Sequence, residues 1–175
     1  MSGDNPPGAG NQQERPGIEQ WIVGFVDGEG CFSVPIYRCP SYRIGWQVQP
    51  RFAVVQGERS KHALEVIQRY FGCGSLYRNR RRDNHREDLF VYGVFRFEHL
   101  RQRIVPFFED HPLVTAKAEE FTKFASVLRM MEARLHLTVE GLTTIAEIAQ
   151  TMNHRKPSRF LESPEAIRQP TLLDG

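Results

Sequence analysis

Apolar and polar residues follow two different periods along this chain, and each change of period marks an expected element. An apolar run over residues 18–27 predicts a short buried helix, which the glycines of Asp27-Gly28-Glu29-Gly30 bring to an end. Apolar residues then recur at every second position, which predicts strands near 31–38 and 44–56, although Pro50 disturbs the phase of the second. The first third of the chain is therefore expected to form a helix and a strand pair.

The same order of elements recurs farther along the chain. Apolar residues on one face predict a helix over residues 60–71, with Ser60 as its cap, and strands are expected near 75–80 and 88–97. Further helices are expected near residues 98–105, 115–131 and 140–152. Helix, strand pair, helix, strand pair and helices together predict an α+β domain with an antiparallel four-stranded sheet.

Composition sets the expected limits of this domain. Residues 1–17 are rich in Gly, Pro, Asn and Gln and are expected to be a disordered tail, residues 18–152 a single domain, and residues 153–175 an irregular extension. No apolar run approaches the roughly 18 residues that cross a membrane. The three cysteines lack metal-site spacing, so we expect reduced thiols in an intracellular protein. Because nothing resembles a transit peptide, bacterial cytoplasm is favoured over an organelle matrix.

Charge is distributed unevenly, although the net charge is only +2. Residues 31–105 hold 14 Lys and Arg against 6 Asp and Glu, while the remainder holds 9 basic and 15 acidic residues. This separation predicts a polyanion-binding face on one part of the fold. The alternative is a solvated surface that is basic by chance.

Polar side chains fall on one face of three of the expected strands. Such residues can read base edges in the major groove of DNA, where a two-stranded ribbon fits. The candidate reading residues are Ser33, Tyr37, Gln47, Gln49, Arg51, Tyr77 and Asn79. Candidate phosphate contacts are the nearby arginines Arg78, Arg80, Arg81, Arg82 and Arg86. The alternative reading of polar strand faces is plain solvent exposure.

Two glycines lie inside the first expected helix. Gly24 and Gly28 are four residues apart, so they share one helix face, where each costs about 1 kcal/mol relative to alanine. Two such residues favour close approach of another backbone, and a single copy of the motif points to the same helix of a second subunit. Alternatively, the glycines pack against the protein's own strands.

Two carboxylates lie at the end of this helix. If two such helices pair, Asp27 and Glu29 of both subunits come close together, and like charges there require a metal ion or a proton. Mg²⁺ prefers such oxygen ligands and can activate water for phosphodiester hydrolysis. On its own, an Asp-Gly-Glu-Gly helix end is more often a simple helix stop.

With these features in place, the chain resembles the LAGLIDADG homing endonucleases, the site-specific DNases encoded by mobile introns. The span from Trp21 to Gly30 is similar to their signature, and the order of later elements matches as well. These elements are the strand ending in Phe52-Ala-Val-Val-Gln56, the helix closing on Phe71-Gly72-Cys73-Gly74, the arginine-rich hairpin, and Val105-Pro106-Phe107-Phe108 before a lysine-bearing helix. The resemblance implies an αββαββα core with extra C-terminal helices. It also implies a dimer interface on the motif helix that includes Trp21, Gly24 and Gly28.

The resemblance implies a role for several residues of the chain. Glu29 would bind the metal, helped by the backbone carbonyl of Gly28, and Asp27 would be a catalytic residue with a less direct role. Gln56 would order water near the metal ions. Lys117 corresponds best to the family's catalytic lysine, while Arg59 and Lys61 stay open as basic residues near the scissile phosphate. Most members have aspartate where this chain has Glu29.

The implied function is that of a homodimer that uses Mg²⁺, or Mn²⁺, to cut double-stranded DNA. Its site would be long and roughly palindromic, and cleavage would leave short 3′ overhangs. One alternative on the same fold is a maturase that binds its own intron RNA and assists splicing. Another is a non-catalytic DNA-binding regulator, which would be expected to have lost the acids.

Overall fold

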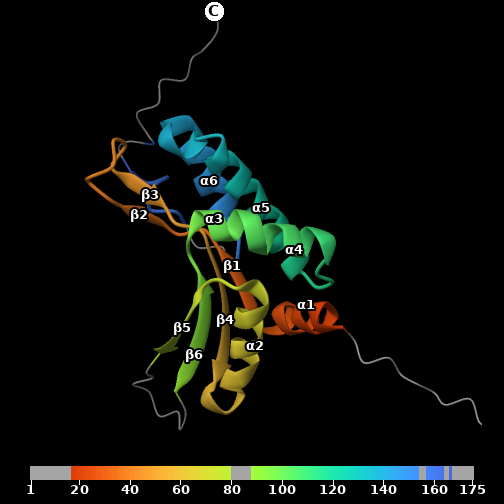
Figure 1. The fold of residues 1–175 in the computed structure, drawn as a ribbon. Coiled ribbons are helices and arrows are strands. Elements are labelled where there is room, and N and C mark those ends of the chain that lie inside the picture. Colours follow the sequence, from red (N-terminus) through yellow and green to blue (C-terminus); the bar gives the residue numbers. More distant parts are fainter. Residues whose placement is uncertain (1–16, 80–87, 154–156, 164–165, 167–175) are drawn as a thin grey trace, which may run out of the picture.

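The computed structural model describes residues 17–79, 88–153, 157–163 and 166, and it confirms an α+β fold with an antiparallel four-stranded sheet. The sheet has the order β1-β4-β6-β5, in which β1 covers Gly30–Ser33, β4 Arg51–Gly57, β5 Ser75–Asn79 and β6 Leu89–Val94. Helix α1 (Ile18–Glu29) leads directly into β1, so the acidic motif lies where the helix meets the edge of the sheet (Figure 1).

A separate two-stranded ribbon extends from this sheet. It pairs β2 (Ile36–Arg38) with β3 (Trp46–Val48), and the two long strands expected near 31–38 and 44–56 are therefore wrong as single strands. Each is interrupted at a proline, Pro35 or Pro50, and proline cannot donate to a strand ladder. The chains stay adjacent there, because the Gln49 N–H donates to the Pro35 carbonyl at 2.9 Å.

One face of the four-stranded sheet is covered by helices. Helix α2 (Lys61–Phe71) contacts β4, β5 and β6 and buries Leu64, Ile67 and Phe71. A short 3-10 turn, η1 (Glu58–Ser60), precedes it, and the Ser60 side chain makes no capping hydrogen bond, contrary to the expectation. Beyond Phe71 the chain turns through Gly72 and Gly74, both with positive φ.

The second half of the described chain is mainly helical. It contains α3 (Phe97–His99), the π-helical turn η2 (Leu100–Ile104), α4 (Val105–Asp110), α5 (Lys117–Glu132), the 3-10 turn η3 (Leu135–Leu137) and α6 (Val139–Gln150). The helix expected near 98–105 thus continues to Asp110. The π-helical turn ends two residues before Pro106, where the helix lacks one N–H donor. None of the helices in the described ranges is long and apolar enough to cross a membrane.

An aromatic core joins the two halves. The Phe32 ring stacks on Phe52 with centroids 5.1 Å apart and contacts Phe121 and Phe124 of α5. The described residues after α6 contribute to this packing as well. Phe160 is 1% exposed, and its ring meets the Trp46 ring edge-on at 5.5 Å. The expected tail of residues 1–17 lies almost wholly outside the described ranges, so the domain limits stay a prediction.

Candidate functional site

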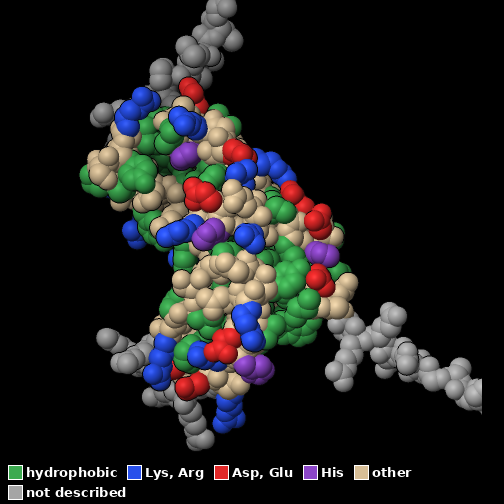
Figure 2. Space-filling view, viewed as in Figure 1, with side chains coloured by type: hydrophobic (Ala, Val, Ile, Leu, Met, Phe, Trp, Pro, Cys, Tyr) green, Lys and Arg blue, Asp and Glu red, His purple; other side chains and the backbone are tan. Residues whose placement is uncertain are grey.

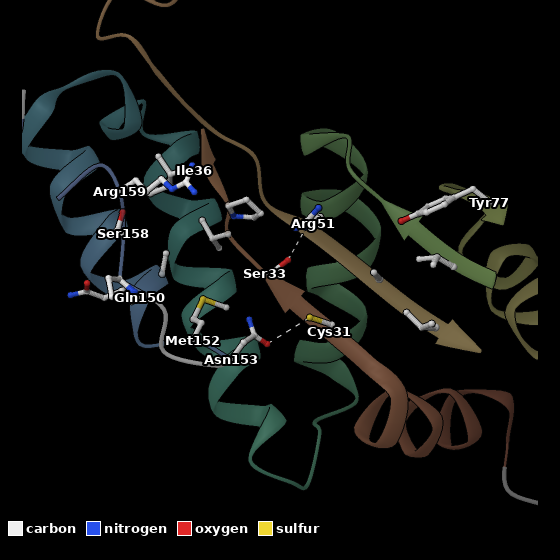
Figure 3. A pocket seen from close by; sticks show the side chains of 17 residues that line it. Cys31, Ser33, Ile36, Arg51, Tyr77, Gln150, Met152, Asn153, Ser158 and Arg159 are labelled. Carbon is white, nitrogen blue, oxygen red and sulfur yellow. Dashed lines mark hydrogen bonds between the residues drawn. The ribbon is translucent and has the colours of Figure 1, made fainter. Parts of the chain in front are cut away.

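A groove runs along the sheet face that α2 leaves uncovered (Figure 3). Strand alternation sends Phe32, Phe52 and Val54 into the core and their neighbours to the opposite side. The sheet contributes Cys31, Ser33, Arg51, Ala53, Val55, Tyr77 and Val91 to the lining of this groove, called the sheet groove below. Three of the predicted DNA-reading residues therefore share it: Ser33, Arg51 and Tyr77.

Ser33 and Arg51 contact each other in the sheet groove. They are direct partners in the register of β1 and β4, and Arg51 Nε donates to Ser33 Oγ at 3.1 Å (Figure 3). The hydrogen bond fixes the guanidinium plane while leaving its other donors available. A guanidinium group held at the floor of a groove can bind phosphate or the edge of a guanine base.

Other predicted reading residues lie beyond the sheet groove. Tyr37 and Gln47 are direct partners in the ribbon, and Tyr37 is 45% exposed. Gln49 is exposed where the ribbon meets the sheet, and Asn79 is exposed at the end of β5. Tyr37, Gln49 and Asn79 thus lie on the surface, whereas Gln47 is half-buried and lines, with Gln49, a second pocket beside Trp46 and Met131.

The arginine-rich hairpin is described only in part. Arg80, Arg81, Arg82 and Arg86 lie outside the described residues, and they include Arg80 and Arg82, the two phosphate contacts that the resemblance implies. Arg78 is described, and it forms an ion pair with Asp88 across the hairpin. Its charge is thereby partly neutralised, which makes Arg78 a weaker candidate for phosphate binding than its spacing suggested.

The sequence reading missed one wall of the sheet groove. Residues after α6 contribute Met152, Asn153, Pro157, Ser158 and Arg159, and the end of α6 contributes Gln150 (Figure 3). Asn153 anchors this wall, since its Nδ2 donates to the Phe32 carbonyl at 2.9 Å and its N–H donates to Glu120 at 3.0 Å. A signal was present, because Met152 and Phe160 are buried apolar residues in an otherwise polar stretch.

At the end of α1 the two acids have different surroundings. Glu29 is the last residue of the helix, and its side chain is exposed. Asp27, in contrast, accepts three hydrogen bonds, from the Val114 N–H at 2.8 Å, the Thr115 N–H at 3.3 Å and the Thr115 hydroxyl at 2.8 Å. Burial raises the pKa of Asp27, but these hydrogen bonds and the nearby Lys117 outweigh it, so the pKa lies below its ordinary value.

Lys117 lies beside these acids. It is the first residue of α5, and its Nζ donates to the backbone carbonyl of Gly30, next to Glu29. Lys61, one of the alternatives, is instead paired with Glu65 at 3.0 Å along α2. The geometry therefore favours Lys117 over Lys61 as a basic group near Glu29, while Arg59 lies in the exposed turn before α2.

Gln56 lies on β4, whose residue Val54 is the register partner of Gly30. The end of α1 is therefore close to the last part of β4, which carries Gln56. Gln56 is half-buried and pairs with Phe90 of β6. The structure thus brings the end of α1, the start of α5 and the end of β4 to one side of the sheet.

The exposed face of α1 contains both glycines. A Cβ placed on Gly24 or Gly28 would have nothing within 4 Å, so neither glycine packs against the protein's own strands. Trp21 and Phe25 flank them, half-buried, with stacked rings 5.1 Å apart. Hydrophobic side chains gather where α1 lies, as Figure 2 shows. Close approach to the strands is excluded as the reason for these glycines.

A single chain offers few ligands for a metal ion. Within the described ranges no three His, Cys, Asp or Glu side chains are grouped to hold one. Glu29 and the Gly28 carbonyl are hard oxygen donors on an exposed helix end, which suits Mg²⁺, but they are too few for a complete site. A second copy of α1 across a two-fold axis would double the number of these oxygen donors.

Comparison with known proteins identifies relatives over most of the chain. The sequence model described as LAGLIDADG endonuclease matches residues 22–128. The probable intron-encoded endonuclease 3 of Neurospora crassa is 33% identical over 138 residues, which make up 78% of this chain and 25% of that protein. The chain thus spans about a quarter to a third of the length of its first curated relatives.

Solved structures agree with this match. The homing endonuclease I-TnaI is 41% identical with a TM-score of 0.77, and the match covers 86% of this chain and 97% of that one. The LAGLIDADG homing endonuclease I-LtrWI, solved bound to its target DNA, is 32% identical with a TM-score of 0.72, over 86% of this chain and 48% of that one. With the motif helix, the sheet and the matched sequence in agreement, this chain belongs to the LAGLIDADG endonuclease family.

Proposed function

We propose that this protein is a homing endonuclease that cuts double-stranded DNA at a long, roughly palindromic site. The observation that carries the proposal is the exposed Glu29 at the end of α1, beside Lys117 and next to a groove that holds Arg51. The groove suits DNA because its polar and basic side chains can bind phosphates and base edges. A neighbour bound to its target DNA, I-LtrWI, supports the same partner for this chain.

The active unit is proposed to be a homodimer that pairs two copies of α1. The open face of Gly24 and Gly28 supports this pairing, because it lets two helix backbones approach closely. The match to nearly the whole I-TnaI chain, but to about half of the I-LtrWI chain, fits a unit that needs a second copy.

The C-terminal end of each paired helix would hold Mg²⁺ through Glu29 and the Gly28 carbonyl. When bound, the ion would activate a water molecule and stabilise the leaving oxygen. The residues of the chain have separate tasks. Gln56 would orient water, Lys117 would supply positive charge near the scissile phosphate, and Ser33, Arg51 and Tyr77 would position the DNA in the sheet groove.

Glu29→Gln tests the proposal directly. The amide has nearly the same shape but is a poor Mg²⁺ ligand, so cleavage should fall by at least about 100-fold. DNA affinity, measured by gel shift in Ca²⁺, should stay within about threefold. The substrate is a plasmid carrying the host sequence that lacks the intron.

Glu29→Asp is the matched control, because it keeps the charge and restores the side chain commonest in the family. It should retain measurable cleavage in Mg²⁺. If Glu29→Gln cuts at the wild-type rate, the proposed metal ligand is wrong. If the wild type binds the intron RNA and never cuts DNA, the endonuclease proposal fails and the maturase takes its place.

A further inference from the structure

We infer that Asp27 is a positioning residue rather than a ligand of the metal ion. It holds Lys117 and the Gly28-Glu29 segment in place. The inference rests on the proposed function and refines one of its residues. Asp27 uses both of its carboxylate oxygens to accept hydrogen bonds from the segment before α5.

Those bonds hold a segment whose other backbone hydrogen bonds come from α5 itself, from the Ala118 and Glu119 N–H groups to the Thr115 and Ala116 carbonyls. Val114 is 87% exposed, and Thr115 and Ala116 are exposed too, so their side chains do not anchor them in the core. The nearest buried residue is Leu113, which is 6% exposed. Asp27 therefore determines where the chain enters α5, through its bonds to Val114 and Thr115, the third and second residues before Lys117.

Thr115 connects Asp27 to Lys117 through hydrogen bonds. Its hydroxyl donates to Asp27 at 2.8 Å and accepts from the Lys117 N–H at 3.2 Å. The Lys117 Nζ in turn donates to the Gly30 carbonyl. These hydrogen bonds link Asp27 through Thr115 and Lys117 to Gly30, and the backbone from Gly30 back to Asp27 closes the ring, called the clasp below.

The clasp encloses the proposed metal-binding segment. Asp27 and Gly30 flank Gly28 and Glu29 in the sequence, and both contact the start of α5. A rigid attachment on each side limits the freedom of the exposed Glu29 carboxylate and of the Gly28 carbonyl. Such restraint matters because a misplacement of about 1 Å can cost about 100-fold in rate.

A positioning role and a metal-ligand role for Asp27 predict different effects of a substitution at Thr115. Thr115→Val keeps the shape, removes the hydroxyl and leaves every carboxylate in place. If Asp27 acts through the clasp, the single-turnover cleavage rate should fall between about 10-fold and 100-fold. Asp27 would keep its hydrogen bonds to the Val114 and Thr115 N–H groups, and these hold Gly28 and Glu29 in place. The DNA affinity in Ca²⁺ and the Mg²⁺ concentration for half-maximal rate should therefore stay unchanged. Thr115→Ser, which keeps the hydroxyl, should recover most of the loss.

Asp27→Asn and Lys117→Met complete the test. Because Asp27 acts through Lys117, Asp27→Asn should cost much less in the Lys117→Met background than in the wild type. A purely structural role would give additive losses. A metal ligand would raise the Mg²⁺ requirement in Asp27→Asn and leave Thr115→Val active.

Hydrogen exchange gives a readout that does not depend on cleavage. The Val114 and Thr115 amides should be protected in the wild type and should exchange faster in Asp27→Asn, with Ca²⁺ and DNA absent. Unchanged protection, or wild-type cleavage by Thr115→Val, would overturn the inference. If the wild type does not cut DNA, the proposed function fails, while the exchange experiment still tests the clasp.

Discussion

Residues of the same type differ in role according to what surrounds them. Asp27 and Glu29 are two positions apart, yet Asp27 accepts three hydrogen bonds while Glu29 is exposed. The same holds for Gly72 and Gly74, which both have positive φ after α2. Only Gly74 lies against other atoms, so the two glycines differ in how far a side chain would disturb them.

Gly74→Ala should destabilise the protein by about 2–5 kcal/mol. A Cβ there would lie 2.7 Å from the Tyr92 ring and 2.8 Å from the Gly93 carbonyl, at a φ of +79°. Strain from the left-handed backbone contributes about 1–2 kcal/mol and overpacking about 1–3 kcal/mol. The free energy of unfolding in urea measures the loss.

Gly72→Ala is the matched control for that change. Its φ is +61°, but a Cβ there would have nothing within 4 Å. Only the backbone strain of about 1–2 kcal/mol should be lost. Equal losses at the two positions would show that the contacts of Gly74 do not matter.

At the scale of elements, α1 is the one whose sequence and structure agree most closely. Its buried residues, Ile22 and Val26, face the core, and the glycines face outward with open space beside them. The strands agreed less well. Alternation predicted their faces correctly on either side of Pro35 and Pro50, but it continued them through both prolines.

Gly24→Leu should turn the proposed dimer into a monomer without unfolding it. The position is open in the single chain, and leucine favours a helix over glycine by about 1 kcal/mol, so the monomer should keep its stability. The larger side chain would separate the paired helices. Sedimentation velocity measures the change in association.

Gly24→Ala serves as the comparison, because its single methyl group is compatible with close helix packing. It should stay largely dimeric. A Gly24→Leu protein that associates with wild-type affinity would place the dimer interface on another surface.

At the scale of the whole molecule, the residues after α6 connect distant parts. Phe160 packs on Trp46 of the ribbon, Asn153 binds the carbonyl of Phe32 in β1, and Arg159 lines the sheet groove. The basic segment of residues 31–105 contains the two strands of the ribbon and nearly all of the sheet, together with α2.

Phe160→Ala should lower the free energy of unfolding by about 3–5 kcal/mol. The ring is 1% exposed, and its removal leaves a cavity between the ribbon and the helices. Urea denaturation followed by circular dichroism measures the loss. The neighbouring Glu162→Ala, at an exposed position, should change stability by no more than about 0.5 kcal/mol. A loss that small in Phe160→Ala would show that the segment is not part of the core.

The sequence alone determined the motif helix, the faces of the strands and the order of the elements, because these depend on local period and turn residues. It also identified Glu29, Gln56 and Lys117 as candidates through resemblance, and their roles stay a proposal. Tertiary structure decided what those residues contact. The hydrogen bonds of Asp27 to Thr115 and of Asn153 to Phe32 join positions 88 and 121 residues apart. No local pattern encodes such pairs, since they form only when the packed core brings distant segments together.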